Sequence, residues 1–474
     1  MTQNIRRRVV KGMGAAAIGP LILRHAPAIA QGADIVIGAA QPVTGVFAFA
    51  GLQMHYGMQD YVEWRNGKGG VQGRKLRYVM EDSGFKVDQG VAIFKKVMAA
   101  DKPSFFYCDG TPLVKAITRD AIDSGHVMTS STSLASAVAD PATAPQHFVP
   151  GATYGRLHEV LMEYVAKTWK GADKPRIAYV YTEAEFGIDG IPAAKARAAR
   201  LGLPIVAEVV TKPGGVGVDV STEVAKLRRA RPNIVVFQGF INAPMPEFAR
   251  QMKEAGMDVE IFGTAWGLDK PAYDGLAAVG ENLTGVSLYA VGDEDVPMLR
   301  EIRQHLAKAR PNTTHLSPFY ISAWFTAMVF AEVAERCLKE NKPLTLPNMK
   351  AALESIRNWD TGGLIGLPFL AHYSASKFAL DGLVEALRTE VEPLGIQATV
   401  VHPGDFNTAL GSNRMHCADT KPGTAYYERF RKIVAFYDAA KHNGGSPDQV
   451  ARKVELLLSK RQLPVRVVVG STLE

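Results

Sequence analysis

The chain contains 474 residues, of which 47% are hydrophobic and 21% are charged, a composition typical of a globular protein with two or three domains. Its net charge of +7 is concentrated before residue 31, where five basic residues stand without an acidic one, and the rest of the chain carries +2. This balance argues against binding to nucleic acid or to a strongly acidic partner.

The first 30 residues have the pattern of a removable signal peptide, which predicts export to the periplasm. A basic start is followed by an apolar run from about Gly12 to Leu23 and by Ala28-Ile29-Ala30. This run is too short to cross about 30 Å of hydrocarbon, so we do not expect it to anchor the chain. The stretch from Arg6 to Lys11 resembles the twin-arginine export pattern, and an ordinary secretory leader is the alternative.

From residue 33 the sequence alternates short apolar segments with amphipathic ones. Residues 88–101, 191–202 and 221–232 have the spacing of helices, and the apolar segments between them predict strands. Alternation of this kind predicts an α/β fold with mostly parallel sheets covered by helices on both faces. One series precedes the stretch from Pro141 to Pro150 and another follows it, which indicates two lobes. The predicted strands are residues 33–40, 75–82, 103–110, 176–182, 204–210, 233–239 and 259–265.

The three cysteines, Cys108, Cys337 and Cys417, are far apart in the sequence, and no Cys-x-x-Cys pair occurs. Their odd number and wide spacing argue against a disulfide framework or a zinc site. We therefore expect buried free thiols and no bound metal ion.

Several segments, in the same order along the chain, carry a resemblance to one family. Residues 37–83, YTEAEFGIDG (181–190), QMKEAGMDVEIFGT (251–264) and LESIRNWDTGG (353–363) resemble periplasmic solute-binding proteins for branched-chain amino acids and amides. The resemblance implies a type I binding-protein fold, a small-molecule ligand, no cofactor, and the membrane subunits of an ABC transporter as partners.

The same resemblance implies a solute-binding domain at residues 31–363. We expect its first lobe at about 34–140 plus about 280–340. The second lobe is expected at about 150–275 plus about 345–363, without its last strands.

Small hydroxyl side chains follow several predicted strands, where free N–H groups at helix starts could hold a carboxylate or an amide. The resemblance implies ligand contacts at Thr111 and in the 131–133 segment, and aromatic walls elsewhere. Two alternatives remain open, because Ser and Thr often cap helices and aromatic residues are more often part of the core. The candidate ligand-binding residues are Thr44, Thr111, Ser131, Thr132, Ser133, Phe186, Phe240 and Trp266.

One position departs from the family pattern. Amino-acid binders of this family keep an acid near the GTAWG segment to pair with the ligand ammonium, whereas this chain has Ala265 and Trp266 there. A buried ammonium group without a counter-charge is costly. The missing acid therefore argues against a zwitterionic amino acid as the ligand. It favours an amide or an organic acid, including an aromatic carboxylate.

The last part of the chain resembles a second family. The segment YSASKFALDGLVEALRTEVEPLGIQATVVHPGDFNT, from residue 373, is similar to short-chain dehydrogenases/reductases. The resemblance implies that Tyr373 exchanges a proton with the substrate, that Lys377 lowers its pKa, and that the nicotinamide site is lined further along the chain. The implied cofactor-lining residues are Pro403, Gly404 and Thr408.

The remainder of a dehydrogenase is absent from the sequence. No Gly-rich turn for a pyrophosphate precedes this segment, and Asp360 stands where the family has its catalytic serine. Residues 364–474 are therefore expected to be a partial Rossmann-like fragment without a cofactor. NAD(P) is expected only if the chain is an oxidoreductase that uses Tyr373 and Lys377, and a fusion with neither function is a further alternative.

The two resemblances overlap on Gly362, Gly363 and Leu364, which predicts a chimera joined at this string. An evolved fusion of whole domains is the alternative, but it would leave both domains complete. The helix expected at residues 373–392 carries an apolar face that could mediate a dimer.

Overall fold

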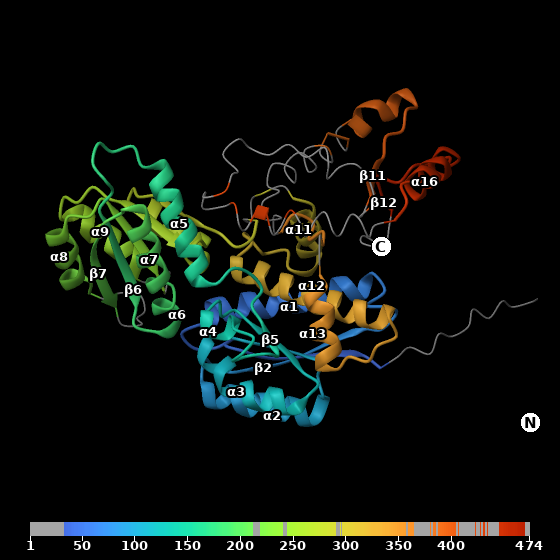
Figure 1. Cartoon of the computed structure of the whole chain (residues 1–474), viewed down its shortest axis with the longest axis horizontal. Helices are drawn as coiled ribbons and strands as arrows, with labels where there is room; N and C mark the ends of the chain where they lie inside the picture. The colour runs from blue at the N-terminus through green and yellow to red at the C-terminus, as the bar shows by residue number, and fades with distance from the viewer. Residues whose placement is uncertain are drawn as a thin grey trace, which may run out of the picture.

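The computed structural model shows two α/β lobes and a smaller C-terminal unit (Figure 1). The residues that it describes are 33–469, apart from 212–218, 240–243, 291–293, 295, 357–358, 365–379, 381–382, 385–386, 404–405, 407–421, 423–426, 428–429, 432–433 and 435–444.

The first lobe is built on a parallel five-stranded sheet in the order β2-β1-β3-β4-β5. Every residue of β1 is buried, as expected for a strand covered on both faces. The helices α1 and α12 pack on each other, and α2 packs on α3. The strands are β1 (Ile35–Gln41), β2 (Leu76–Asp82), β3 (Phe105–Cys108), β4 (Met128–Ser131) and β5 (His147–Phe148). The helices are α1 (Ala48–Gly67), α2 (Val87–Asp101), α3 (Thr111–Ser124), α4 (Ser136–Ala139), α11 (Pro297–Ala309), α12 (Pro318–Lys339) and α13 (Leu346–Glu354).

The second lobe repeats this plan with the strand order β10-β9-β8-β6-β7, and all its strand pairs are parallel. Here α5 packs on α7, and α9 packs on both α8 and α10. The strands are β6 (Ile177–Thr182), β7 (Ile205–Thr211), β8 (Ile234–Gln238), β9 (Glu260–Thr264) and β10 (Leu283–Val286). The helices are α5 (Tyr154–Thr168), α6 (Glu185–Ile188), α7 (Ile191–Leu201), α8 (Ser221–Ala230), α9 (Pro244–Glu254), α10 (Lys270–Ala277) and the short 3₁₀ helix η1 (Ala265–Gly267).

The predicted two-lobed α/β fold is confirmed, but three lobe boundaries differ from those expected. The 280–340 segment begins in the second lobe, because β10 pairs with β9 there. The 345–363 segment begins in the first lobe, because α13 packs on α12 and β4. Strand β5 also extends the first lobe beyond residue 140.

The C-terminal unit contains a parallel pair of strands with its own small core. Phe406, Leu457, Val467 and Val469 are buried together there. Its elements are η2 (Glu392–Leu394), β11 (Val400–Pro403), α16 (Asp448–Leu458) and β12 (Arg466–Val469).

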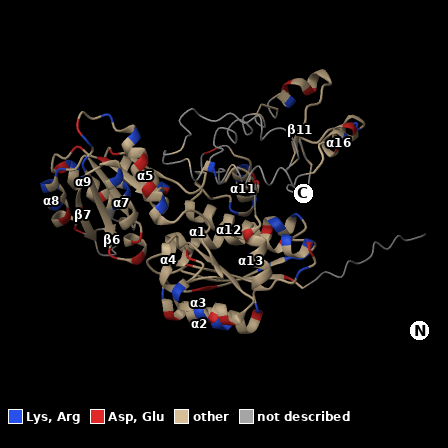
Figure 2. Cartoon of the chain, in the orientation of Figure 1, with Lys and Arg blue, Asp and Glu red and all other residues tan. Residues whose placement is uncertain are grey.

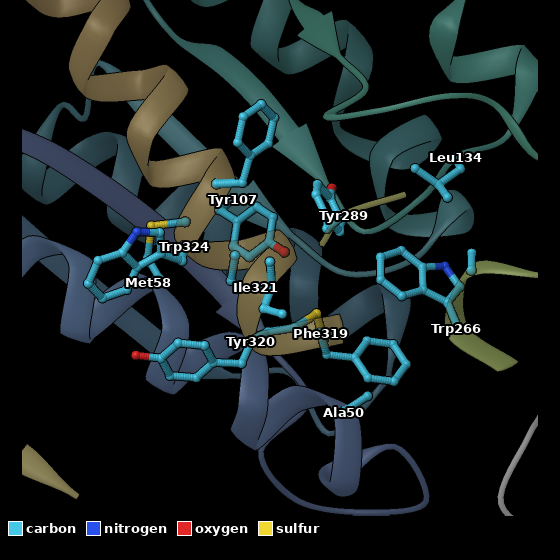
Figure 3. Close-up of a cluster of buried hydrophobic side chains, with 14 of the residues drawn as sticks. Ala50, Met58, Tyr107, Leu134, Trp266, Tyr289, Phe319, Tyr320, Ile321 and Trp324 are labelled. Atoms are coloured by element: carbon cyan, nitrogen blue, oxygen red, sulfur yellow. The ribbon is translucent and has the colours of Figure 1, made fainter. Parts of the chain in front are cut away.

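Helix α12 forms the centre of the first lobe. Most of its residues are apolar and buried, so it packs against neighbours on nearly all sides instead of presenting one apolar stripe. Trp324 is fully buried, and its ring centroid lies 5.4 Å from that of Tyr61 in α1 and 6.2 Å from that of Tyr320 in α12. Figure 3 shows Trp324 and Tyr320 in this part of the core.

A buried ion pair also ties the first lobe together. Asp60 of α1 is 0% exposed, and both of its oxygens accept hydrogen bonds at 2.8 Å from the guanidinium of Arg310, just after α11. The hydroxyl of Tyr320 donates a further bond to Asp60 at 3.0 Å. The outer helices, in contrast, carry interspersed charges of both signs (Figure 2).

The close approach of α1 and α12 depends on Gly57. A Cβ atom at this position would lie 2.2 Å from the backbone oxygen of Tyr320. Alanine usually stabilises a helix interior by about 1 kcal/mol over glycine, but here the clash outweighs that gain. We expect Gly57→Ala to lower the free energy of unfolding by about 1–3 kcal/mol in urea titrations. Gly67→Ala, at the exposed end of α1 with nothing within 4 Å, is the matched control and should be neutral or stabilising.

In the part of the chain that the structure describes, no helix has both the length and the apolar character needed to cross a membrane.

Candidate functional site

The carboxyl edges of the two sheets face each other. Lys115, in α3 after β3, forms an ion pair with Glu185 after β6. Ser136, after β4, donates from its N–H at 3.1 Å and from its hydroxyl at 2.6 Å to Asp189 after α6. These contacts join the lobes at the strand ends, where open α/β sheets bind their ligands. The candidate site is therefore where these two edges meet.

A cluster of buried hydroxyls occupies the edge of the first sheet. Thr111, the first residue of α3, is 2% exposed, and its Oγ1 lies 2.6 Å from Oγ of Ser133. Ser131 ends β4 and accepts a bond from the N–H of Ser133 at 3.1 Å, while Thr132 Oγ1 accepts one from the N–H of Gly110 at 3.4 Å. The sequence-predicted residues Thr111 and 131–133 thus lie together.

Thr44 lies apart from this cluster and organises a loop. It is exposed, and its N–H and hydroxyl both donate to Asp82, at 3.3 and 2.5 Å. The N–H groups of Val43 and Gly84 also donate to Asp82, at 3.0 and 2.9 Å. Burial alone would raise the pKa of Asp82, but these hydrogen bonds hold it below its ordinary value. Asp82 therefore already has its full set of partners.

Asp109 is a residue at this edge that the sequence analysis missed. It directly follows β3, two residues before Thr111, and is 5% exposed. The hydroxyl of Ser83 donates to it at 3.3 Å. Burial raises the pKa of Asp109 to about 7, and Ser83 opposes this only in part. The signal was present in the sequence, because the acid stands beside the predicted contact in the CDGT segment.

The facing edge of the second sheet carries uncharged polar groups at the ends of three neighbouring strands. Thr264 of β9 donates to the side-chain oxygen of Gln238 in β8 at 2.6 Å, and Gln238 donates to the carbonyl of Phe186 at 2.9 Å. Thr182 ends β6 with a buried hydroxyl that has no hydrogen-bond partner among the described residues. The predicted residue Phe186 is half-buried in α6 at this edge.

Trp266 packs between the lobes. It belongs to η1 of the second lobe, and its ring stacks on Phe319 of α12 with centroids 4.8 Å apart and an interplanar angle of 11° (Figure 3). Its indole N–H donates to the hydroxyl of Tyr154 at 3.1 Å. Trp266 is therefore both a core residue and part of the boundary between the lobes.

Five predicted site residues lie outside the described part of the chain. Pro403 is described, as the exposed last residue of β11. The five residues that are not described are Phe240, Tyr373, Lys377, Gly404 and Thr408.

One group of possible metal ligands occurs among the described residues, formed by Asp60, Glu63 and His305. The Arg310 guanidinium already occupies the Asp60 carboxylate. A cation held by Asp60 would have to displace this partner, so the cluster is better explained as part of the ion pair described above.

Comparisons with known proteins show which families the chain resembles. The sequence profile of the periplasmic binding protein family matches residues 34–374, more than half of the chain. The chain belongs to the periplasmic binding protein family. The profile of the short chain dehydrogenase family matches residues 361–417 and overlaps the end of the first match. Both resemblances stated from the sequence are thereby confirmed.

Relatives of this periplasmic binding protein fall into the same two groups. "Leu/Ile/Val-binding protein homolog 3" of Brucella melitensis is 28% identical over 270 residues, which are 55% of this chain and 64% of that protein. "3-ketodihydrosphingosine reductase" of Bacteroides thetaiotaomicron is 34% identical over 127 residues, which are 26% of this chain and 47% of that protein. The chain thus covers less than two thirds of either relative.

Solved structures show the same fold at low sequence identity. A branched-chain amino acid ABC transporter protein from Thermus thermophilus with bound valine has a TM-score of 0.64 at 20% identity, covering 72% of this chain and 88% of that one. A solute-binding protein from Rhodopseudomonas palustris in complex with 3,4-dihydroxybenzoic acid has a TM-score of 0.55 at 18% identity, covering 67% of this chain and 84% of that one.

Proposed function

We propose that this periplasmic binding protein captures a small polar solute between its lobes and delivers it to the membrane subunits of an ABC-type uptake system. The solute is an amino acid, an amide or a small organic acid. The observation that carries this proposal is the buried Thr111–Ser133 hydroxyl pair, which lies on a sheet edge that faces the second lobe. Two hydroxyls and the first N–H groups of α3 can together hold a carboxylate or an amide oxygen.

Polar contacts between the two lobes support this proposal. The ties from Lys115 to Glu185 and from Ser136 to Asp189 both cross the boundary at the rim of the candidate site. Lobes that close around a ligand must break and remake contacts of this kind. Uptake outside the cytoplasm also agrees with the signal-peptide and twin-arginine patterns, which lie in residues 1–30, outside the described part of the chain.

Thermal-shift screening of amino acids, amides and organic acids tests the proposal, and Thr111→Val identifies the site. Removing the hydroxyl leaves a buried ligand oxygen without a donor, at a cost of about 1.5–3 kcal/mol. We therefore expect the affinity for any stabilising ligand to fall about 10- to 100-fold in calorimetric titrations. Thr118→Val is the matched control, because the Thr118 hydroxyl bonds to the carbonyl of Val114 within α3. Absence of stabilisation by every ligand class would contradict the proposal.

The proposal assigns no hydride transfer to the C-terminal segment. Residues 364–474 contain Tyr373 and Lys377 but lack a Gly-rich turn for a pyrophosphate. The alternative is that the chain is an oxidoreductase that binds NAD(P). A dimer through residues 373–392 is a separate prediction.

We also propose that the chain is a chimera joined near Gly362. The two family profiles overlap at residues 361–374, which contain the shared Gly-Gly-Leu string. This string packs with the solute-binding part, because Leu364 is buried in its core and the carbonyl oxygens of Gly362 and Leu364 accept bonds from Met298 and Ala290 at 2.8 and 3.0 Å.

A further inference from the structure

Asp109 is a buried acid at the candidate site with very few partners. Among the described residues, the hydroxyl of Ser83 is the one group from another residue that bonds to its side chain, at 3.3 Å. No lysine, arginine or histidine of the described chain forms an ion pair with it within 4 Å. A carboxylate that is 5% exposed and lacks a cation is unusual, because a buried charge is normally paired.

The other acids at the strand ends are satisfied. Asp82 accepts bonds from three backbone N–H groups and one hydroxyl. Asp269, after β9, accepts bonds from the N–H of Lys270 at 2.8 Å and the hydroxyl of Ser317 at 2.7 Å. Asp189 accepts bonds from Ser136 across the lobes. The incomplete set of partners is therefore particular to Asp109 and is not a general property of this edge.

We propose that Asp109 accepts the cationic amine of the ligand, so that the solute carries an ammonium group beside the carboxylate or amide that Thr111 and Ser133 hold. This inference rests on the proposed function and narrows its ligand class to amino acids and related amines. It also revises the sequence-based preference for ligands without an ammonium group. Ala265 and Trp266 stand where the family keeps its acid, and an acid after β3 in the other lobe supplies the counter-charge.

The groups around Asp109 agree with an incoming cation. The titratable groups that interact with Asp109 are Asp82 at the end of β2 and the Cys108 thiol in β3, and neither supplies a positive charge. The loop after β4 contributes the hydroxyl of Thr132, and α3 contributes that of Thr111. An α-amino acid carries its ammonium and carboxylate on one carbon. Its ammonium can therefore donate to Asp109 while its carboxylate accepts from the hydroxyl of Thr111, two residues further along the chain.

The proposal predicts proton release on binding. Without ligand, burial holds the pKa of Asp109 at about 7, so much of the carboxyl is protonated at and below neutral pH. An ammonium group binds the ionised form, and its affinity should rise up to about tenfold per pH unit from about pH 5.5 and level off near pH 8. An analogue without the amine gains nothing from ionisation and should not follow this rise.

The experiment uses the full chain and two matched pairs of probes, L-leucine with 4-methylpentanoate and L-phenylalanine with 3-phenylpropanoate. Affinities are measured by calorimetry at pH 8 for the unmodified protein, Asp109→Asn and Asp123→Asn. Asp123 is an exposed acid near the other end of α3 and serves as the control for loss of one negative charge. We expect Asp109→Asn to lower the affinity for the amino acid that binds at least about 30-fold and to change the affinity for its deaminated partner by less than about threefold. Asp123→Asn should change neither affinity.

Each outcome decides the proposal. Equal effects of Asp109→Asn on both members of a pair, or no effect, would overturn the role of Asp109 while the solute-binding function stands. If neither L-leucine nor L-phenylalanine binds while the thermal-shift screen finds a ligand without an amine, this inference fails and the proposed function stands; if that screen finds no ligand of any class, both fail. Titrations of the unmodified protein at pH 6.5 in two buffers with different ionisation enthalpies need no variant. They should show release of a fraction of a proton with the amino acid and none with its deaminated partner, and the opposite would overturn the proposal.

Discussion

Replacing Arg310 by alanine is expected to lower the free energy of unfolding by about 3–5 kcal/mol, because it leaves a buried carboxylate without its counter-charge. Asp60 is 0% exposed, and both of its oxygens accept bonds at 2.8 Å from Arg310. The hydroxyl of Tyr320 would remain as a donor, but a neutral hydroxyl cannot balance the charge. The loss should therefore be far larger than that for an ordinary surface ion pair.

Urea unfolding followed by tryptophan fluorescence measures this effect, since Trp64 and Trp324 belong to the same lobe. The matched control is Arg250→Ala, because Arg250 is paired with Glu247 and Glu254 on the exposed side of α9 and should contribute less than about 1 kcal/mol. The double variant Asp60→Asn/Arg310→Ala should lose less than the sum of its parts, since it removes the unpaired charge. Equal losses for Arg310→Ala and Arg250→Ala would show that the pair is not buried in solution.

Asp109→Asn is expected to stabilise the ligand-free protein at pH 8 by about 2–4 kcal/mol and to change its stability little at pH 4. The pKa of Asp109 is raised from 3.8 to about 7 in the folded state, mainly by burial. The folded protein therefore holds this proton more tightly than the unfolded chain does. The stability from the protonated form is complete below about pH 4 and is lost as the pH rises through about 7. Asparagine cannot ionise, so the variant should not show this loss.

Chemical unfolding at pH 4, 6 and 8 without ligand gives the required free energies. The difference between Asp109→Asn and the unmodified protein should grow steadily with pH, whereas Asp123→Asn, on the exposed face of α3, should show no such growth. Parallel pH profiles for the unmodified protein and Asp109→Asn would mean that Asp109 has an ordinary pKa. This measurement concerns the ligand-free chain and is independent of ligand identity.

Most of the strand pattern could be predicted from local sequence. Segments such as 233–239 and 259–265 are short, apolar and bounded by turn residues, and they correspond to β8 and β9. The burial of β1 on both faces explains why its sequence has no polar residue before Gln41 and does not alternate. The parallel arrangement then follows from the helices between the strands.

The lobe boundaries could not be predicted in the same way, because they depend on contacts between distant segments. Nothing in the four residues of β10 indicates that they pair with β9, and nothing in α13 indicates that it packs on β4. In a protein whose chain passes between lobes more than once, the choice of lobe is made by long-range packing. Spacing and periodicity carry no information about that choice.

The candidate site could be predicted in part from small hydroxyl residues that follow strands. Hydroxyls after strands identified Thr111 and the 131–133 segment, which lie together, but the same rule selected Thr44, whose hydroxyl is taken up by Asp82. Asp109 was missed because an acid at a strand end is normally an ordinary surface residue. Its burial, which decides its chemistry, is visible only in the fold.

Helix α6 spans only Glu185–Ile188, yet the ties to Lys115 and Ser136 both start there or one residue beyond it, at Glu185 and Asp189. The Trp266–Phe319 stack and the bond from Ser317 to Asp269 join the lobes at other places. A displacement of this one short turn would therefore break two of the contacts between the lobes together and leave the others intact.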